Sequence, residues 1–238
     1  STAERLTQIF TVIAPAVLLA VVIERELREN GLQLFLGDGV ASFDEQADAI
    51  AVSLQSGQTI TADLVVLAIG VAPETAFLAN SGITLGPRGH IVVNAQLQTS
   101  RPDIYAVGDA IEVVDFVNGK QTAIPLAGPA NKQGRIAADN IAGLSSRFNG
   151  SQGTAVLNVF SLTAAATGNN ERTLQRNGTP YRTAIVHPNS HAAYYPGALP
   201  LTIKLLFDDV GRILGAQSVG IDGVDKRMDV IATVMRLK

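Results

Sequence analysis

The 238-residue sequence has no cysteine, no tryptophan and only three histidines. Without cysteine, the chain by itself can form no disulfide, no thiolate metal site and no cysteine-based redox centre. The histidines are His90, His187 and His191, and no two of them have the spacing of a metal site on a helix. We therefore expect no bound metal.

The sequence also lacks an excess of one charge. It has 18 Lys and Arg residues against 21 Asp and Glu residues, and aromatic residues make up only 5% of it. A nucleic-acid-binding domain would show a basic patch interleaved with aromatic side chains, so we expect no nucleic-acid partner. Hydrophobic residues form 47% of the chain, which is ample for a packed core. The length allows one large domain or two smaller ones.

Residues 9–23 form the longest apolar stretch, but they do not suit a membrane span. The stretch is shorter than the ~20 residues that a spanning helix needs, Pro15 interrupts it, and charged residues follow it directly. It lacks the flanks of a signal peptide as well. We predict a helix that begins near Pro15, ends at Glu29 or Asn30 and is closed by Gly31. Its first half is apolar on nearly every side, so it should be deeply buried or face something missing from this chain. The plain expectation is a cytoplasmic protein with no membrane partner.

Short strands and turns are expected in the rest of the first half. The pattern predicts a β-meander after Gly31. The continuous apolar run that ends at Gly70 is typical of a central strand in a covered parallel sheet. The strands are expected at 32–36, 40–43, 49–54, 59–61, 63–70 and 90–93, with a short helix at 73–80.

The second half predicts an α+β unit. Residues 128–142 have helical composition, with Pro129 near the start and Gly143 after the end. Residues 143–154 are rich in Gly, Ser, Asn and Gln, which favours a domain boundary there. Strands are expected after it at 155–162, 181–186, 199–207 and 213–219, followed by an amphipathic helix at 224–237.

One acidic residue stands at an unusual place. Residues 104–107 predict a short, fully buried strand, and Gly108 leads from it directly to Asp109. A buried carboxylate is costly unless something satisfies it. Asp109 is either the cap of a turn or a ligand-binding group at the carboxyl end of a strand, where open α/β sheets place their ligands. In the second case it would accept a hydrogen bond from a ligand hydroxyl, and Gly108 would let the backbone approach closely.

Two further features bear on ligand binding. The segment 125–130 leads into a helix whose N-terminal N–H groups could stabilise negative charge, although an ordinary Pro-initiated helix has the same pattern. Gly37-Asp38-Gly39 begins like a dinucleotide fingerprint, but Ser42 replaces the third glycine, and we interpret it as a β-turn. The sequence has no Gly-x-Gly-x-x-Gly, no P-loop and no Gly-x-Ser-x-Gly elbow.

Several stretches resemble the pyridine nucleotide-disulfide oxidoreductases, in the branch of coenzyme A-disulfide reductases, NADH oxidases and persulfide reductases. TSRPDIYAVGDA (99–110) resembles the second flavin fingerprint of the family, and LAGPANKQGRIAADNIAG (126–143) the helix that follows it. ADLVVLAIGVAPET (62–75) is similar to the strand and turn that close the NAD-binding domain. Three later stretches resemble the C-terminal dimerisation domain, namely ATGNNERTL (166–174), HPNSHAAYYPGA (187–198) and ILGAQSVGIDGVDKRMDVIATVMR (213–236).

The resemblance implies FAD and NAD(P)H as cofactors. It gives Asp109 the role of binding a ribityl hydroxyl of FAD, with Gly108 beside the pyrophosphate-ribityl region. It places Leu126, Ala127 and Ala130 near the flavin ring, with the helix N-terminus facing the N1/C2 carbonyl edge, where negative charge collects in reduced flavin.

The resemblance also implies sites outside the flavin. Ile69 and Gly70 would line the nicotinamide nucleotide site. Tyr194 or Tyr195, of which we favour Tyr194, would act across a homodimer interface toward the disulfide-reducing site of the other subunit. His191 could equally have a structural role in its loop.

The implied fold class is α/β: partial FAD/NAD(P)-binding Rossmann-like domains followed by an α+β dimerisation domain. Residues 1–95 would be the remainder of the NAD(P)-binding domain, 96–150 the C-terminal segment of the FAD-binding domain and 151–238 most of the dimerisation domain. The implied activity is transfer of hydride from NAD(P)H through flavin to a disulfide, a persulfide or oxygen.

The sequence departs from the family pattern, because both dinucleotide fingerprints and the redox cysteine are absent. It therefore resembles the middle and C-terminal portion of a longer enzyme, and we expect weak or no flavin binding by these residues alone. The main alternative is a dimerisation module that binds no flavin. A ferredoxin or rubredoxin reductase-like flavoprotein shares the Gly-Asp motif, but HAAYYPGA and GVDKR argue against it.

Overall fold

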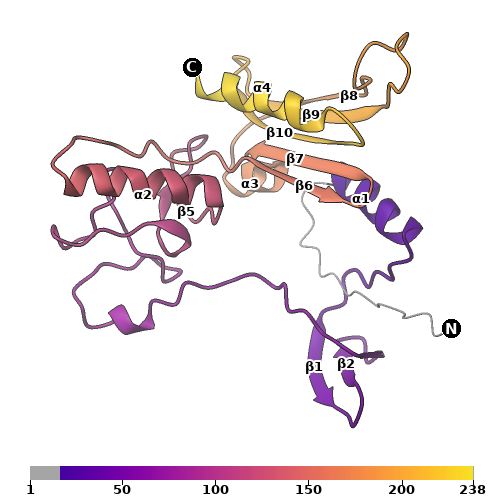
Figure 1. The fold of residues 1–238 in the computed structure, drawn as a ribbon, viewed down its shortest axis with the longest axis horizontal. Coiled ribbons are helices and arrows are strands. Elements are labelled where there is room, and N and C mark those ends of the chain that lie inside the picture. Colours follow the sequence, from indigo (N-terminus) through magenta and orange to yellow (C-terminus); the bar gives the residue numbers. More distant parts are fainter. Residues whose placement is uncertain (1–16, 238) are drawn as a thin grey trace. The chain divides into compact units, whose positions relative to one another are not determined.

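The computed structural model describes residues 17–237, which form two compact units. The first unit contains the described residues up to Gly70 together with Asn158–Leu162, and the second contains Val71–Leu157 and the residues from Thr163 onward. The fold mixes helices with antiparallel sheets (Figure 1). None of the helices between residues 17 and 237 has the length and apolar character needed to cross a membrane.

The first unit begins with helix α1 (Val17–Glu29), which ends where the sequence predicts. Gly31 adopts a left-handed conformation with φ of 84°, and the Leu32 N–H donates back to the Leu27 carbonyl at 3.0 Å. Such a glycine satisfies the last carbonyls of a helix without steric cost. Deep burial of its apolar half within the described residues is not observed, because Val21 is 59% exposed. The other expectation, that this half faces something absent from these residues, stays a prediction. The expected start at Pro15 lies outside the described residues.

A three-stranded antiparallel meander follows, as expected, although residues 32–36 before it form no strand. The central strand carries the buried side chains, with Val52 completely buried. The strands are β1 (Val40–Glu45), β2 (Ile50–Leu54) and β3 (Thr59–Ala62).

The predicted central strand at residues 63–70 is wrong. These residues lie in an irregular, exposed segment, with Val66 72% and Ile69 68% exposed. A parallel strand is stable only when neighbouring strands satisfy its backbone and helices cover both faces. None of the described strands pairs with this segment, so its apolar composition alone does not make it a strand.

The second unit begins with short elements around a small core. The expected helix at 73–80 is reduced to one 3₁₀ turn, and the expected strand at 90–93 forms only isolated bridges. Leu97, Ile111, Val113 and Ala137 pack together as the core. The elements are η1 (Ala76–Leu78), η2 (Gly108–Ala110), β4 (Val113–Val114), β5 (Gln121–Thr122) and α2 (Ala127–Ile141).

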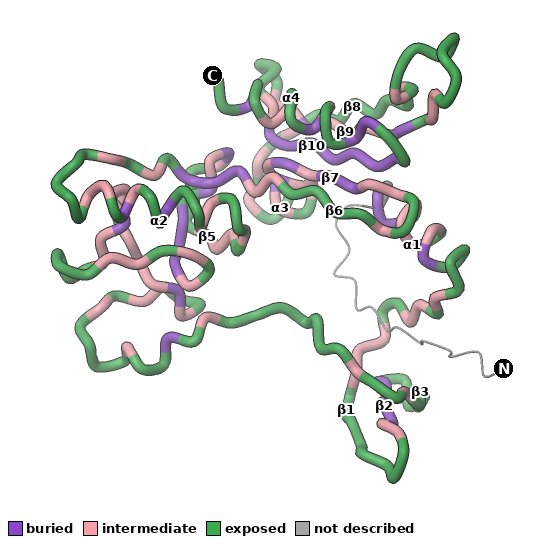
Figure 2. The backbone as a smooth tube through the Cα atoms, in the orientation of Figure 1, coloured by how far each residue is buried: buried purple, intermediate pink, exposed green. Residues whose placement is uncertain are grey.

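The rest of the second unit is built on a five-stranded sheet with the order β6-β7-β10-β9-β8. Helix α4 packs on β10, where Met228 and Val224 are completely buried against Leu201. Figure 2 shows the resulting run of buried residues along β10. The elements are β6 (Ala155–Val159), β7 (Leu162–Gly168), α3 (Glu171–Arg176), β8 (Arg182–Val186), β9 (Leu201–Phe207), β10 (Ile213–Gly220) and α4 (Val224–Arg236).

A buried polar joint connects the turn between β4 and β5 to this sheet within the second unit. The Asp115 carboxylate accepts hydrogen bonds from the side-chain amides of Asn118 at 2.8 Å and Asn169 at 2.7 Å. Asp115 and Asn169 are both buried, so the pair replaces the water that these groups lose.

Arg236 at the end of α4 strengthens the same joint. Its guanidinium lies 4.0 Å from the centre of the Phe116 ring and donates to the carbonyls of Asn149 at 3.1 Å and Gly150 at 2.7 Å. Burial lowers the pKa of Arg236 below its ordinary value, yet an arginine remains protonated at neutral pH. The cation therefore contributes to the joint at neutral pH.

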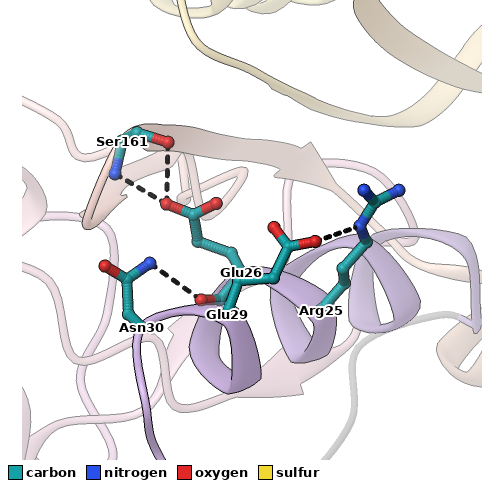
Figure 3. A network of polar contacts seen from close by, with 5 residues as sticks. All are labelled: Arg25, Glu26, Glu29, Asn30 and Ser161. Atoms are coloured by element: carbon teal, nitrogen blue, oxygen red, sulfur yellow. Dashed lines mark hydrogen bonds and ion pairs between the residues drawn. The ribbon is translucent and has the colours of Figure 1, made fainter.

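The first unit contains a polar contact that responds to pH (Figure 3). The Glu26 carboxylate accepts hydrogen bonds from the Ser161 hydroxyl at 2.7 Å and the Ser161 N–H at 2.9 Å. These bonds, that from the hydroxyl above all, hold the pKa of Glu26 below its ordinary value of 4.5. The stabilisation from this contact is therefore present above pH 4.5 and is lost as the pH falls through the lowered pKa.

Replacing Ser161 with alanine should raise the pKa of Glu26 toward 4.5, because the larger of the two hydrogen-bond contributions disappears. An NMR titration of the Glu26 side-chain carboxyl carbon through the acidic range measures it. Ser145→Ala, at an exposed serine of the second unit, is the matched control. An equal Glu26 pKa in the wild type and Ser161→Ala would contradict the assignment.

Candidate functional site

The Gly108–Asp109 turn forms the first part of the candidate site. Gly108 has a φ of 84°, and a Cβ added there would meet no atom within 4 Å. Asp109 lies next to it in η2, is exposed, and its carboxylate has no hydrogen bond to any residue between 17 and 237. The side chain is therefore a free acceptor beside an open stretch of backbone.

The buried strand expected before this turn is wrong. Ile104 and Val107 are each 40% exposed, and the segment pairs only through a bridge between Tyr105 and Gln98. A fully buried strand needs neighbours on both sides, and the described part of the chain offers one short contact. The Asp109 charge consequently faces solvent and carries no burial penalty in this structure.

The N-terminus of α2 forms the second part of the site. Leu126 is the N-cap residue, and its apolar side chain cannot accept from the first N–H groups of the helix. The first turn, which includes Ala127 and Ala130, contains no acidic residue. Pro129 has no N–H, and the Ala130 N–H donates to the Leu126 carbonyl at 3.2 Å. The helix therefore presents the N–H groups of Ala127 and Gly128 and the positive end of its dipole.

Gln133 joins the two parts and is the residue that the sequence did not single out. Its Oε1 accepts from the Gly108 N–H at 2.7 Å, and the side chain is only 1% exposed. Ala137, one helical turn later, is buried in the core beneath. A glutamine on the inward face of a helix, four residues before a buried alanine, is the signal that could have indicated it.

The other predicted site residues lie on separate elements. Ile69 and Gly70 belong to the exposed segment of the first unit, and Gly70 has a φ of 97°. Tyr194 and Tyr195 lie in the loop between β8 and β9, 82% and 60% exposed, with ring centres 4.6 Å apart. In that loop, the His191 Nδ1 lies 3.2 Å from the carbonyl oxygen of the neighbouring Ala192.

The residues present fit the ribityl and ring portion of a bound flavin. Asp109 offers a free acceptor, α2 offers N–H donors, and the missing Cβ at Gly108 leaves room between them. The hydrogen bond through Gln133 holds the acceptor and the donors together. A carboxylate acceptor and a helix N-terminus are groups of the kind that recognise ligand hydroxyls and negatively charged groups.

Comparison with known proteins identifies the class. The sequence pattern of the family described as "Pyridine nucleotide-disulphide oxidoreductase" matches residues 5–134, and the chain belongs to this family. It is similar to the crystal structure of reduced Bacillus anthracis CoADR-RHD, with 48% identity and a TM-score of 0.91 over 95% of this chain and 41% of that one. It is also similar to an NAD-dependent persulfide reductase from A. fulgidus, with 36% identity and a TM-score of 0.88 over 92% of this chain and 41% of that one.

A curated relative adds a third activity. The "NADH oxidase" of Methanocaldococcus jannaschii is 31% identical over 90% of this chain and 47% of its own length. The chain therefore spans less than half the length of this relative. The predicted family and the mixed fold of FAD/NAD-dependent oxidoreductases are confirmed.

Proposed function

We propose that the chain supplies the ribityl-and-ring half of the FAD site in an oxidoreductase that passes hydride from NAD(P)H through flavin to a disulfide, a persulfide or oxygen. The observation that carries the proposal is the hydrogen bond from Gly108 to Gln133, which joins a free Asp109 carboxylate to an open helix N-terminus. The similarity to a persulfide reductase and an NADH oxidase supports the range of acceptors.

Each residue has a defined task in this proposal. Asp109 accepts a hydrogen bond from a ribityl hydroxyl, and Gly108 leaves the backbone accessible to the cofactor. Leu126, Ala127 and Ala130 lie against the ring, where the N–H groups of α2 stabilise negative charge at its pyrimidine edge. The flavin supplies the hydride chemistry when bound, and these residues bind and orient it.

The remaining predicted residues belong to the same proposal. Ile69 and Gly70 line the NAD(P)H site, and the backbone at Gly70 leaves the nucleotide room to approach. Tyr194, or the adjacent Tyr195, faces the disulfide-reducing site of a second copy in a homodimer. Their exposure in the single chain is compatible with contact to another subunit.

Visible absorption tests the proposal. A full-length protein that includes these 238 residues should purify with flavin bands near stoichiometric with protein, and NADH or NADPH should bleach them without oxygen. The isolated 238-residue chain is the comparison, and we expect it to hold little or no flavin because it has no glycine-rich pyrophosphate site. A colourless full-length protein that takes up no added FAD would refute the proposal.

A further inference from the structure

The loop that carries the two tyrosines has little structure of its own. Residues 191–197, between β8 and β9, are all exposed (Figure 2). The backbone hydrogen bond within them runs from the Tyr195 N–H to the Ala192 carbonyl at 3.1 Å. A loop with so few internal contacts takes its orientation from its base.

The base of the loop is closed by a pair of residues. The Ser190 N–H donates to the Leu199 carbonyl at 2.8 Å, and the Leu199 N–H donates to the Ser190 hydroxyl at 3.2 Å. These bonds bring the two ends of the loop together. They do not fix the orientation of the loop relative to the sheet.

Arg227 on α4 fixes the orientation of the loop. Its Nη2 donates to the carbonyls of Asn189 and Ser190, both at 2.9 Å, and its Nη1 donates to the Gly223 carbonyl at 3.2 Å. No carboxylate between residues 17 and 237 forms an ion pair with Arg227. The planar guanidinium is thus engaged with three backbone carbonyls, a geometry that a lysine cannot reproduce.

The helix that bears Arg227 is itself firmly placed. Val224 and Met228, on either side of Arg227, are completely buried in the core under the sheet. A Cβ added at Gly223 would lie 2.9 Å from Arg227 Nη1 and 3.5 Å from Ser190, so the contact is tightly packed. Arg227 therefore connects a rigid core helix to an exposed loop.

We propose that Arg227 is a positioning residue, which sets the place of Tyr194 and Tyr195 relative to the disulfide-reducing site of the second subunit. The inference rests on the proposed function for the role of the tyrosines, but the hydrogen bonds to the loop base are independent of it. A small misplacement of a reacting group lowers turnover more than it lowers binding.

Hydrogen exchange tests the contact directly. Arg227→Gln should make the amides of Ser190 and Leu199 exchange about tenfold faster, because the loop base loses hydrogen bonds from a charged donor. Amides in the buried part of α4 should be unchanged. Lys226→Gln removes a charge from the exposed position directly before Arg227 and is the matched control. Unchanged exchange at the loop base in Arg227→Gln would overturn the proposal.

Kinetics of the full-length enzyme separate this inference from the proposed function. Arg227→Gln should lower kcat for disulfide reduction about tenfold with little change in KM or in the rate of flavin reduction by NAD(P)H, and Arg227→Lys should recover part of it. If Tyr194→Phe slows turnover and Arg227→Gln does not, the positioning role is wrong. If Tyr194→Phe and Tyr195→Phe both leave turnover unchanged, the proposed role of the tyrosines is wrong, even where the exchange data uphold the contact.

Discussion

Replacing Gly215 with alanine should destabilise the second unit by about 3 kcal/mol or more. The added Cβ would lie 1.9 Å from the carbonyl oxygen of Asn169 and 2.9 Å from its carbonyl carbon. Both atoms are backbone, so no side-chain rotation relieves the clash. Urea unfolding followed by circular dichroism measures the loss as a lower midpoint.

The clash also affects the polar joint between the β4–β5 turn and the sheet. The Asn169 N–H donates to the Leu214 carbonyl at 2.9 Å, and its side-chain amide donates to the buried Asp115 carboxylate at 2.7 Å. Displacing this backbone would leave the Asp115 charge short of a donor, which adds to the cost of the overlap. The destabilisation should therefore extend beyond the strand that contains Gly215.

Gly134→Ala is the matched control for this prediction. Gly134 lies within α2, and a Cβ added there meets no atom within 4 Å. The same chemical change should stabilise the protein by about 0.5–1 kcal/mol, because alanine loses less conformational freedom in a helix than glycine. Equal midpoints for Gly215→Ala and the wild type would mean that a Cβ at residue 215 does not overlap with the Asn169 backbone.

Elements that depend on local pattern were predictable from the sequence. The apolar spacing around Met228 predicted α4, and Pro129 with Gly143 framed α2. The alternation of residues 40–61 predicted the meander. The meander strands pair with their neighbours in the chain, and the two helices carry their own apolar spacing and end signals, so the local pattern sufficed for these elements.

The segments that failed depend on partners elsewhere. Residues 63–70 and 104–107 have the composition of central parallel strands, but no neighbouring strand pairs with them in the described residues. The composition of a segment indicates which side chains a strand would bury. It does not indicate whether neighbouring strands pair with the segment or helices cover it. The contact between Gln133 and Gly108 was missed for a related reason, since it joins residues 25 positions apart.

Asp109 is a second residue whose surroundings the sequence could not show. The sequence identified the residue through its place after a buried strand, whereas the structure leaves the strand irregular and the carboxylate in solvent. The burial argument therefore does not apply, and the resemblance to a flavin fingerprint remains the reason to assign Asp109 to the cofactor. A free carboxylate allows that assignment to be tested without a stability penalty.

Asp109→Ala should weaken FAD binding in the full-length protein about 10- to 100-fold, because the ribityl hydroxyl loses a charged acceptor. The free energy of unfolding of the flavin-free protein should stay within about 0.5 kcal/mol of the wild type, since the carboxylate has no partner among residues 17–237. Asp109→Asn keeps an acceptor without the charge and should lose less affinity than the alanine variant.

Flavin fluorescence during titration with FAD measures these affinities, and ultrafiltration separates bound from free cofactor. Asp103→Ala removes an exposed carboxylate from the same loop and should leave FAD affinity unchanged. A loss of stability in flavin-free Asp109→Ala equal to its loss of FAD affinity would assign the residue to the turn, as a cap, and not to the cofactor. Loss of FAD with the apoprotein unaltered would place the carboxylate at the ribityl chain, because only a bound ligand can then account for the missing interaction.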